Sequence, residues 1–397
     1  MKSGRIVKLA SVPVALALVM AACGSDEDSS SSSDVTESTD AAEVTEDSSG
    51  GGGATAEGVL AGVCPDPMVI QTDWFPEAEH GALYEMVGEG YTVDIEKKVV
   101  AGPLVAGGVD TGIGIEVRTG GPAIGFSPVH SQMYADESIV MGYTSLDASA
   151  TFFEDQPTIS VVAPLEKNPQ IVMWDPETYP DVKTIGDLSA EGVTMNVFAG
   201  NAWMDVFVNE GTVEAALVDP SYDGSPARFI AEAGAVAQQG FASAEPYQYE
   251  NEFADWGKPV AYELVHDAGF EAYTQPLGIR SADLEELRPC LELFVPIVQQ
   301  ATIDAIENPD RSNAIIIDAV AQFADFWVYG EGVAAFAVDT MKELGLVSNG
   351  PDGTIGNFDT ERVQSVIDQM IAVDLAPADL VADDIVNNEF IDESIGL

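Results

Sequence analysis

Residues 68–91 read MVIQTDWFPEAEHGALYEMVGEGY and predict a strand, a turn and a helix in direct succession. The apolar and β-branched residues of 68–73 are typical of a buried strand. The helix is expected to begin at Pro76, because proline followed by acidic residues is favoured in a first turn, and to end at Gly88 or Gly90. A strand that leads directly into a helix is the building unit of α/β folds.

Strand and helix patterns alternate through the rest of the folded chain. Further strands are predicted at 91–100, 139–143, 158–163, 170–174, 193–198, 240–244 and 260–265, and a short strand that turns into a helix at 126–134. Further helices are predicted at 184–188, 200–208, 225–239, 282–308, 313–329, 332–344 and 360–373, the fourth of them broken by Pro289 and Pro296. This alternation predicts an α/β fold with largely parallel sheets.

The order of these elements predicts two α/β lobes, joined by crossings near 158–165 and 268–278. We expect lobe 1 to comprise 59–160 and 275–397, and lobe 2 to comprise 161–274. A folded part of this length is too long for one ordinary core and suits two.

The first 23 residues predict export. Basic residues precede an apolar run from 9 to 20, and Met-Ala-Ala then leads into Cys23. This pattern is typical of a signal peptide at 1–22, whose small residues fit a signal peptidase and whose following cysteine carries a lipid. We therefore expect a protein outside the cell membrane, anchored by a lipid on Cys23 to its outer face. A plain signal peptide with an incidental cysteine, or an N-terminal membrane helix, is the alternative.

Residues 23–58 predict a flexible leash between the lipid and the lobes. Ser, Gly, Thr, Ala and acidic residues dominate this segment, and it has no aromatic residue. Such a composition cannot bury enough apolar surface to offset the entropy of ordering. The mean reach of the leash is about 30–35 Å, and charge repulsion would lengthen it.

The charge of the chain excludes one class of partner. Lys and Arg number 15 against 67 Asp and Glu, for a formal net charge of −52. Nucleic acid is not expected to bind, because a polyanion needs a basic footprint. An acid-rich surface for solubility explains the charge. The negative electrostatic field of this surface also disfavours anionic ligands, although salt screens the field within about 8–10 Å.

The three cysteines have two different predicted roles. With Cys23 carrying the lipid, Cys64 and Cys290 remain as an even pair in an oxidising compartment, which predicts a disulfide. Two buried free thiols are the alternative. With so few cysteines and only three histidines, no dedicated metal site is expected, and no motif for a cofactor is found.

Residues 68–91 also resemble the opening of a known family. Its pattern is a strand, Asp or Asn, Trp, Pro, a later His, and a helix that ends in Gly and an aromatic residue. The matching positions here are Asp73, Trp74, Pro76, His80, Leu83, Tyr84, Gly90 and Tyr91. This family joins bacterial ABC-importer solute-binding proteins for thiamine pyrimidine precursors, sulfonates and nitrate with the eukaryotic thiamine-pyrimidine synthases. Weaker similarity follows at 184–188, 244–247, 308–310, 357–359 and 383–392.

The resemblance covers about 65–397 and implies a type II periplasmic-binding-protein fold, with two α/β lobes, a hinge and a central ligand cleft. It implies a monomeric solute-binding lipoprotein, whose lobes close on one small molecule and dock on the membrane permease of an ABC importer. The synthases share a cysteine-rich iron-binding motif, whereas the matching residues 262–278 contain no cysteine. We therefore expect a binding protein with no catalytic residue. An extracytoplasmic enzyme and a ligand-sensing lipoprotein are the alternatives.

Ten residues are candidates for the ligand cleft. Most lie at the carboxyl end of a predicted strand or at the start of the helix that follows, where α/β sheets bind ligands. They are Trp74, His80, Tyr84, Phe126, Ser127, Gly200, Asn201, Trp203, Glu245 and Tyr247. For each of them, core packing, helix capping or a solvated position is the alternative.

The chemistry of these candidates favours a neutral or cationic heteroaromatic ligand of the hydroxymethylpyrimidine type. The Trp74 indole can stack on a planar ring, and His80 can hydrogen-bond to a ring nitrogen or an amine. Glu245 could pair with an exocyclic amine. Sulfonate or nitrate would need an arginine or helix N-termini, and no arginine occurs in a predicted cleft turn.

Overall fold

The computed structural model describes residues 56–397. The predicted signal peptide at 1–22, Cys23 and the leash as far as residue 55 lie outside the described residues. Residues 56–58, assigned to the leash from the sequence, already contact the fold, because the Gly58 amide donates to the Asp110 carbonyl at 3.0 Å. None of the helices in 56–397 has the length and apolarity that a membrane crossing needs.

The first sheet has seven strands in the order β2-β3-β4-β1-β5-β12-β6. Their bounds are β1 Met68–Gln71, β2 Thr92–Asp94, β3 Val99–Ala106, β4 Val109–Arg118, β5 Met141–Tyr143, β6 Thr158–Val162 and β12 Leu277–Arg280. Strand β1 is parallel to β4 and β5. The prediction of largely parallel sheets is wrong at the edges, since β2-β3-β4 and β5-β12-β6 pair antiparallel.

The hairpin β3–β4 was missing from the sequence prediction. Its turn is Gly107-Gly108, with φ of +55° and +81°. Two adjacent positive φ values match the twist of a two-residue hairpin and are strain-free for glycine. The chain therefore turns back on itself here, and β4 becomes the parallel neighbour of β1.

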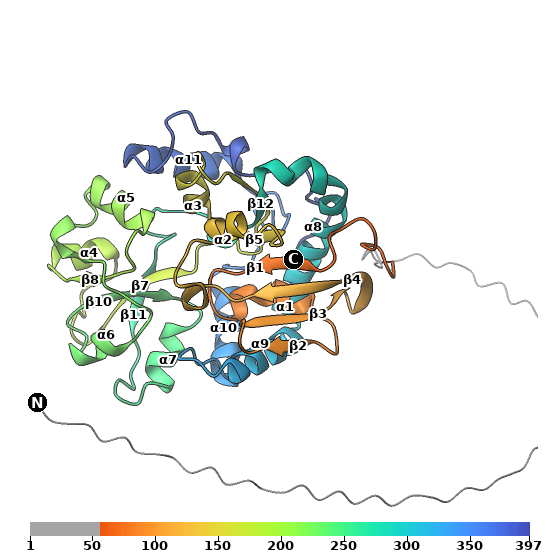
Figure 1. Cartoon of the computed structure of the whole chain (residues 1–397). Helices are drawn as coiled ribbons and strands as arrows, with labels where there is room; N and C mark the ends of the chain where they lie inside the picture. The colour runs from red at the N-terminus through yellow and green to blue at the C-terminus, as the bar shows by residue number, and fades with distance from the viewer. Residues whose placement is uncertain (1–55) are drawn as a thin grey trace, which may run out of the picture. The chain divides into compact units, whose positions relative to one another are not determined.

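The second sheet has five strands in the order β11-β7-β10-β8-β9. Their bounds are β7 Gln170–Trp174, β8 Met195–Asn196, β9 Val218–Asp219, β10 Ala237–Phe241 and β11 Ala261–Leu264. Strand β8 is parallel to β9 and β10, whereas β7 is antiparallel to β10 and β11. Figure 1 shows the two sheets side by side, each with its own helices.

Eleven α-helices and five short 3₁₀ helices are present in the described residues. The α-helices are α1 Gly81–Glu85, α2 Val129–Ala135, α3 Leu146–Thr151, α4 Ile185–Ala190, α5 Ala202–Glu210, α6 Ala227–Ala231, α7 Glu245–Asn251, α8 Leu284–Glu307, α9 Asp310–Phe323, α10 Glu331–Glu343 and α11 Thr360–Ala372. The 3₁₀ helices are η1 Ala78–His80, η2 Gly121–Ile124, η3 Ala215–Leu217, η4 Ser281–Asp283 and η5 Ala382–Asp384.

Three of the predicted helices differ from the structure. The one predicted at 313–329 ends with α9 at Phe323, because Ala324 adopts a φ of +49°. The predicted helix at 225–239 ends with α6, because Ala233 and Gly234 adopt φ of +53° and +73° and redirect the chain into β10. Pro289 and Pro296 lie inside α8 without ending it. Each proline removes one backbone donor, and the buried apolar face of α8 keeps the helix in place by tertiary packing.

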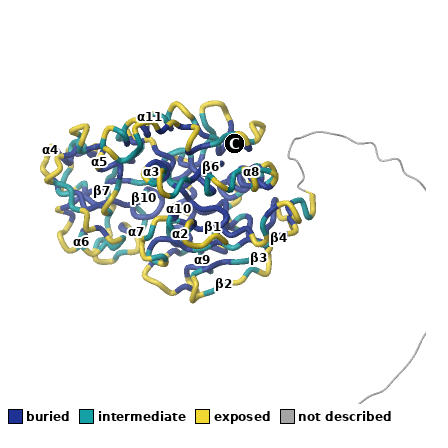
Figure 2. The backbone as a smooth tube through the Cα atoms, turned by 45° about the horizontal axis from the view of Figure 1, so that its top comes forward, coloured by how far each residue is buried: buried dark blue, intermediate teal, exposed yellow. Residues whose placement is uncertain are grey.

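Apolar packing extends from one sheet to the other. Two large clusters of buried apolar side chains make up most of the core. Figure 2 colours the buried segments of the backbone dark blue. Helix α11 packs against both α3 and α5, and α10 packs against both α7 and α9. The described residues 56–397 all belong to one compact unit. The division of this unit into two lobes that move stays a prediction.

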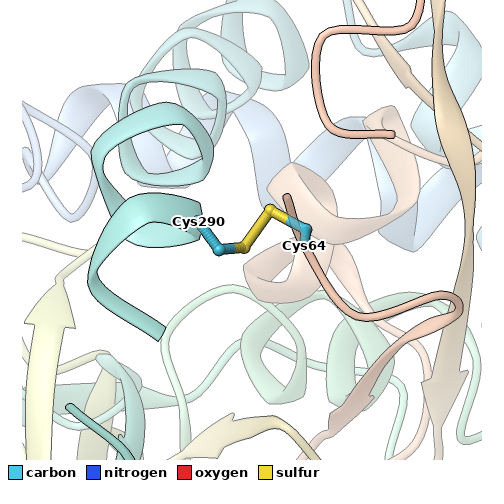
Figure 3. The surroundings of a disulfide bond; sticks show 2 residues. All are labelled: Cys64 and Cys290. Atoms are coloured by element: carbon cyan, nitrogen blue, oxygen red, sulfur yellow. A yellow bond between two sulfur atoms is a disulfide. The ribbon is translucent and has the colours of Figure 1, made fainter. Parts of the chain in front are cut away.

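The predicted disulfide is confirmed in the described structure. Cys64, in the segment before β1, is bonded to Cys290 in the first half of α8 (Figure 3). Both cysteines are buried. The bond ties the start of the folded chain to a helix 226 residues later.

Candidate functional site

A cavity of about 320 Å³ is lined by residues from both sheets. The first sheet and its loops supply Asp73, Trp74, Gly121, Phe126, Ser127, Pro128, Val129, His130, Tyr143, Ser145 and Ala148. The second sheet and its loops supply Gln170, Phe198, Ala199, Asn201, Gln239 and Phe241, and Thr274 lies on the crossing between the sheets.

Strand ends explain why these residues meet. Asp73 and Trp74 follow β1, and Tyr143 ends β5, its parallel neighbour. On the other side, Phe198 follows β8 and Phe241 ends β10, which are also parallel neighbours. The carboxyl ends of parallel strands lie at the same sheet edge, where α/β folds bind ligands.

Two glycines let the Trp74 loop approach its neighbour closely. A Cβ atom on Gly120 would lie 2.2 Å from the Thr72 carbonyl oxygen, and one on Gly121 would lie 2.5 Å from the Trp74 ring. Gly121 also has a φ of +57°. Glycine is therefore required at both positions for the indole to take its place in the cavity wall.

Three aromatic rings form one wall of the cavity. The Trp74 ring centroid lies 6.1 Å from that of Phe126 and 6.1 Å from that of Phe198, and Phe126 and Phe198 are 6.2 Å apart. Phe126 has an exposed fraction of 54%, which is high for so large an apolar side chain. These rings offer π-faces to a planar or cationic group.

Asp73 is the charged group of this wall. One of its oxygens lies 2.9 Å from His80 Nε2, and the other accepts a 3.0 Å hydrogen bond from Gln275 Nε2. Its side chain keeps an exposed fraction of 33%. Among the described residues that line the cavity, none is Lys or Arg and no other is Asp or Glu. The described lining of the cavity therefore has one carboxylate and neither lysine nor arginine, and His80 contacts that carboxylate from behind the wall.

The remaining polar side chains of the cavity are neutral. Burial lowers the pKa of His130 to about 4, so its imidazole is uncharged at pH 7 and lies 3.2 Å from the Ser149 hydroxyl. The hydroxyls of Tyr143 and Thr274 have no hydrogen-bond partner among residues 56–397. The Asn201 amide donates to Gln239 Oε1 at 2.6 Å, which positions both side chains.

Three helices begin beside the cavity. Ser127 and Pro128 precede α2, Ser145 precedes α3, and Asn201 precedes α5. None of the three helices has a side-chain cap. The first amides of a helix lack partners within the helix, so these termini can donate to a ligand oxygen and would suit an anionic group.

Four of the ten candidate residues line the cavity, namely Trp74, Phe126, Ser127 and Asn201. His80 lies behind the wall, fully buried, where it contacts Asp73 and stacks on Tyr143 at 5.2 Å. Gly200 is exposed next to the cavity and is not part of its lining.

Two further candidates lie in the core. The Tyr84 side chain is completely buried, its hydroxyl has no partner in the described chain, and burial raises its pKa. Trp203 has an exposed fraction of 1% and packs on Phe207 at 5.8 Å. Trp203 faces the core because α5 turns its apolar face toward the second sheet and leaves Asn201 at the cavity.

The last two candidates, Glu245 and Tyr247, are not part of the cavity lining. Glu245 lines a separate cavity of about 70 Å³, and its Oε2 accepts a 2.7 Å hydrogen bond from the Phe241 amide. The Tyr247 ring centroid lies 5.5 Å from that of Phe336 in a tilted arrangement, and the Tyr247 ring lies against Gly332 of α10. The structure thus gives Tyr247 a packing position between α7 and α10.

Several cavity residues were missed by sequence reasoning, among them Phe198, Gln239, Phe241, His130 and Tyr143. Most of them lie within two residues of a strand end, which is the signal that could have identified them. Asp73 was part of the quoted family pattern, but its role as the charged group of the wall follows from the structure alone.

No protein-family model matches the sequence, and no curated protein does. Solved structures match the fold. The alkanesulfonate-binding protein SsuA from Xanthomonas axonopodis pv. citri, bound to MOPS, is 12% identical with a TM-score of 0.50, covering 82% of this chain and 100% of that one. The periplasmic aliphatic sulphonate binding protein SsuA from Escherichia coli is 14% identical with a TM-score of 0.50, covering 82% and 94%. The chain has the periplasmic binding protein fold, as the sequence predicted.

Proposed function

We propose that this chain is the solute-binding protein of an ABC importer. It captures one small molecule in the cavity between its two sheets and carries it to a membrane permease. Two observations support the proposal. The fold is that of periplasmic binding proteins, and residues from both sheets line one cavity of about 320 Å³, which is a suitable size for a small ligand.

The ligand that this site suits best is a planar heteroaromatic compound, neutral or positively charged, of the pyrimidine type. The single observation that carries this proposal is Asp73, the one carboxylate in the described lining of a cavity that has neither lysine nor arginine. An amine or a protonated ring nitrogen can donate to Asp73 while the ring packs against Trp74 and Phe126. A neutral His130 and the amide of Asn201 add hydrogen-bonding groups without adding charge.

A sulfonate-type anion is the second candidate. The beginnings of α2, α3 and α5 at the cavity favour it, because the amides of a first turn bind anions. The carboxylate of Asp73 opposes it, since the like charge would lie in the same partly desolvated space. We therefore rank the anion second.

We propose that the protein binds its ligand and does not convert it chemically. Cys64 and Cys290 are joined in a disulfide and are the two cysteines of residues 56–397, so neither thiolate is free to hold iron. The synthase branch of the resembled family depends on such thiolates. An enzyme of that branch is therefore not the proposal.

We further propose that the protein acts as a monomer outside the cell membrane. A lipid on Cys23 would hold it at the membrane surface, and the acidic leash at 23–58 would let it reach a permease. Mass spectrometry of the membrane fraction would test this, since Cys23→Ser is expected to remove the lipid and release the protein.

A ligand screen with a charge variant tests the proposed ligand class. Thermal shift is measured with pyrimidines, thiamine precursors, riboflavin, sulfonates and nitrate, and hits are titrated by calorimetry. We expect a ring compound with an amine to raise the melting temperature. Asp73→Asn should lower the affinity for that compound by roughly 10- to 100-fold, because a hydrogen bond to a charged group contributes about 1.5–3 kcal/mol to binding.

The matched control is Asp205→Asn, which removes an exposed carboxylate on α5 outside the cavity. Its affinity should equal that of the wild type. If sulfonates stabilise the protein and Asp73→Asn strengthens their binding, the anion is the ligand and the heteroaromatic proposal is wrong.

A further inference from the structure

The side chain of Gln239 is a buried polar group in the wall of the cavity. It belongs to β10 of the second sheet and has an exposed fraction of 1%. Its Oε1 accepts two hydrogen bonds, from the Phe198 amide at 3.0 Å and from Asn201 Nδ2 at 2.6 Å. Its Nε2 makes no hydrogen bond within residues 56–397, yet it is not one of the enclosed polar atoms that lack a partner. This nitrogen therefore keeps access to the cavity that Gln239 lines.

The direction of the Gln239 amide group is fixed by its two partners. A backbone N–H can only donate, so the Gln239 atom that lies 3.0 Å from the Phe198 nitrogen has to be the oxygen. Turning the amide over would set two N–H groups against each other and leave a buried donor unpaired. The orientation in which Nε2 stays unbound is therefore the stable one, and its N–H groups are available to a molecule in the cavity.

Asn201 orients Gln239 instead of capping its own helix. It is the N-cap residue of α5, a position at which the side chain of Asn usually accepts a hydrogen bond from an amide of the first turn. No such bond is present in α5. The Asn201 Nδ2 atom donates to the Phe198 carbonyl at 3.0 Å and to Gln239 instead. A residue that leaves its common local role unfilled is typical of a functional site, where geometry matters more than local stability.

Asp73 is held in a comparable way on the side of the first sheet. Gln275 Nε2 donates to both of its oxygens, at 3.0 and 3.3 Å, and His80 contacts one of them. A carboxylate can only accept hydrogen bonds, whereas the Nε2 group of Gln239 can only donate them. The cavity wall thus offers an oriented acceptor from one sheet and an oriented donor from the other. A few precisely placed polar groups of this kind provide the specificity of small-molecule sites.

We propose that Gln239 is a specificity-determining residue, which selects ligands that carry a hydrogen-bond acceptor, and that Asn201 is its positioning residue. The proposal rests on the proposed function, because it describes how the same cavity distinguishes one ligand from another. The ligand accepts from Gln239 Nε2 through a ring nitrogen or a carbonyl oxygen, and it donates to Asp73 through an amine. A ring without the acceptor displaces water from Nε2 and leaves its protons unpaired, so it binds less tightly.

Two ring compounds of the same shape test this selection. The probes are 4-aminopyrimidine and aniline, which share a six-membered ring and an amine, although only the pyrimidine has ring nitrogens that accept hydrogen bonds. Both are titrated against the full chain at a pH where neither compound is charged. The measured quantity is the ratio of the two affinities, because a general loss of the site lowers both affinities together and leaves their ratio unchanged. We expect the wild type to bind the pyrimidine more tightly than aniline.

Gln239→Glu keeps the oxygen that accepts from Phe198 and Asn201, and it replaces the N–H groups at the cavity by a second oxygen. That oxygen repels the lone pair of a ring nitrogen, so the affinity ratio should fall by about 10- to 100-fold. Asn201→Ala removes one of the two bonds that orient Gln239 and should lower the ratio by about 2- to 10-fold. Gln300→Glu, the same change at an exposed position of α8, is the matched control and should keep the ratio of the wild type.

Hydrogen exchange of the side-chain amides, measured by NMR, tests the assignment without a ligand. The Nε2 protons of Gln239 should exchange with water faster than the Nδ2 protons of Asn201, which have two acceptors. The signals that disappear in Gln239→Glu and in Asn201→Ala identify the two groups. An affinity ratio that Gln239→Glu leaves unchanged, or Gln239 protons that exchange as slowly as those of Asn201, would overturn the proposal. If neither ring compound binds the wild type, the proposed ligand class is wrong, and the exchange rates still decide the role of Gln239.

Discussion

Trp203→Ala is expected to lower the free energy of unfolding by about 3–5 kcal/mol, the range for removal of a large buried aromatic side chain. Trp203 is 1% exposed and packs on Phe207 in the core of the second sheet. Its removal leaves a cavity that the neighbouring strands cannot fill. Urea unfolding measures the change. At urea concentrations well below the unfolding midpoint, the variant should bind ligand with the affinity of the wild type.

Trp74→Ala is the matched control for this prediction, because both tryptophans were predicted to bind ligand from the same kind of strand-end position. Trp74 is half-buried and lines the cavity, so its replacement should weaken binding and affect stability less than Trp203→Ala does. The placement of Trp203 in the core would be contradicted if its replacement abolished binding while the unfolding midpoint stayed unchanged.

Loss of the Cys64–Cys290 disulfide is expected to have the second large effect on the free energy of unfolding. The bond closes a loop of 226 residues, so its removal releases much chain entropy into the unfolded state. Removing a native disulfide typically lowers the free energy of unfolding by about 2–5 kcal/mol. We expect Cys290→Ser to lie in this range, measured by urea unfolding of the folded variant at neutral pH.

The experiment is best done in a Cys23→Ser background, because a Cys23 thiol without its lipid could exchange with the disulfide. Reduction of that background protein should reproduce the effect of Cys290→Ser, and reduction of the Cys290→Ser protein should change nothing further. Equal unfolding midpoints for the oxidised background and the Cys290→Ser protein would contradict a stabilising role for the bond.

Local patterns were sufficient for the elements whose own residues specify them. The strand at 68–71, the helix at 360–372 with its Asp359 cap, and the strand at 170–174 lie where the sequence predicts them. The hairpin at 99–118 was missed, although its Gly107-Gly108 turn is a signal that the residues carry. Helix α8 shows the opposite case, since two prolines predict a break and packing overrides them.

The candidate site divides in the same way. Strand ends identified Trp74 and Asn201, because residues that follow a strand lie at the sheet edge. Phe126 and Ser127 also line the cavity, but the short strand predicted at this point is wrong, since both residues lie between η2 and α2. His80 and Tyr84 lie on the same short segment, yet their side chains are buried behind the cavity wall. Which side of a turn faces the cavity depends on what packs against its other side.

The periplasmic binding protein fold was implied by the family resemblance that residues 68–91 carry. The order of strands and helices along the chain was enough to predict an α/β fold, and the count of cysteines was enough to predict the pairing of Cys64 with Cys290. Both follow from short-range chemistry, since alternation and pairing are properties of the residues themselves. The charge of the cavity, the burial of Trp203 and the contact between Glu79 and Ser243 were not predictable, because each joins segments far apart in the chain. Distances of that kind are set by how the two sheets pack, which no local pattern encodes.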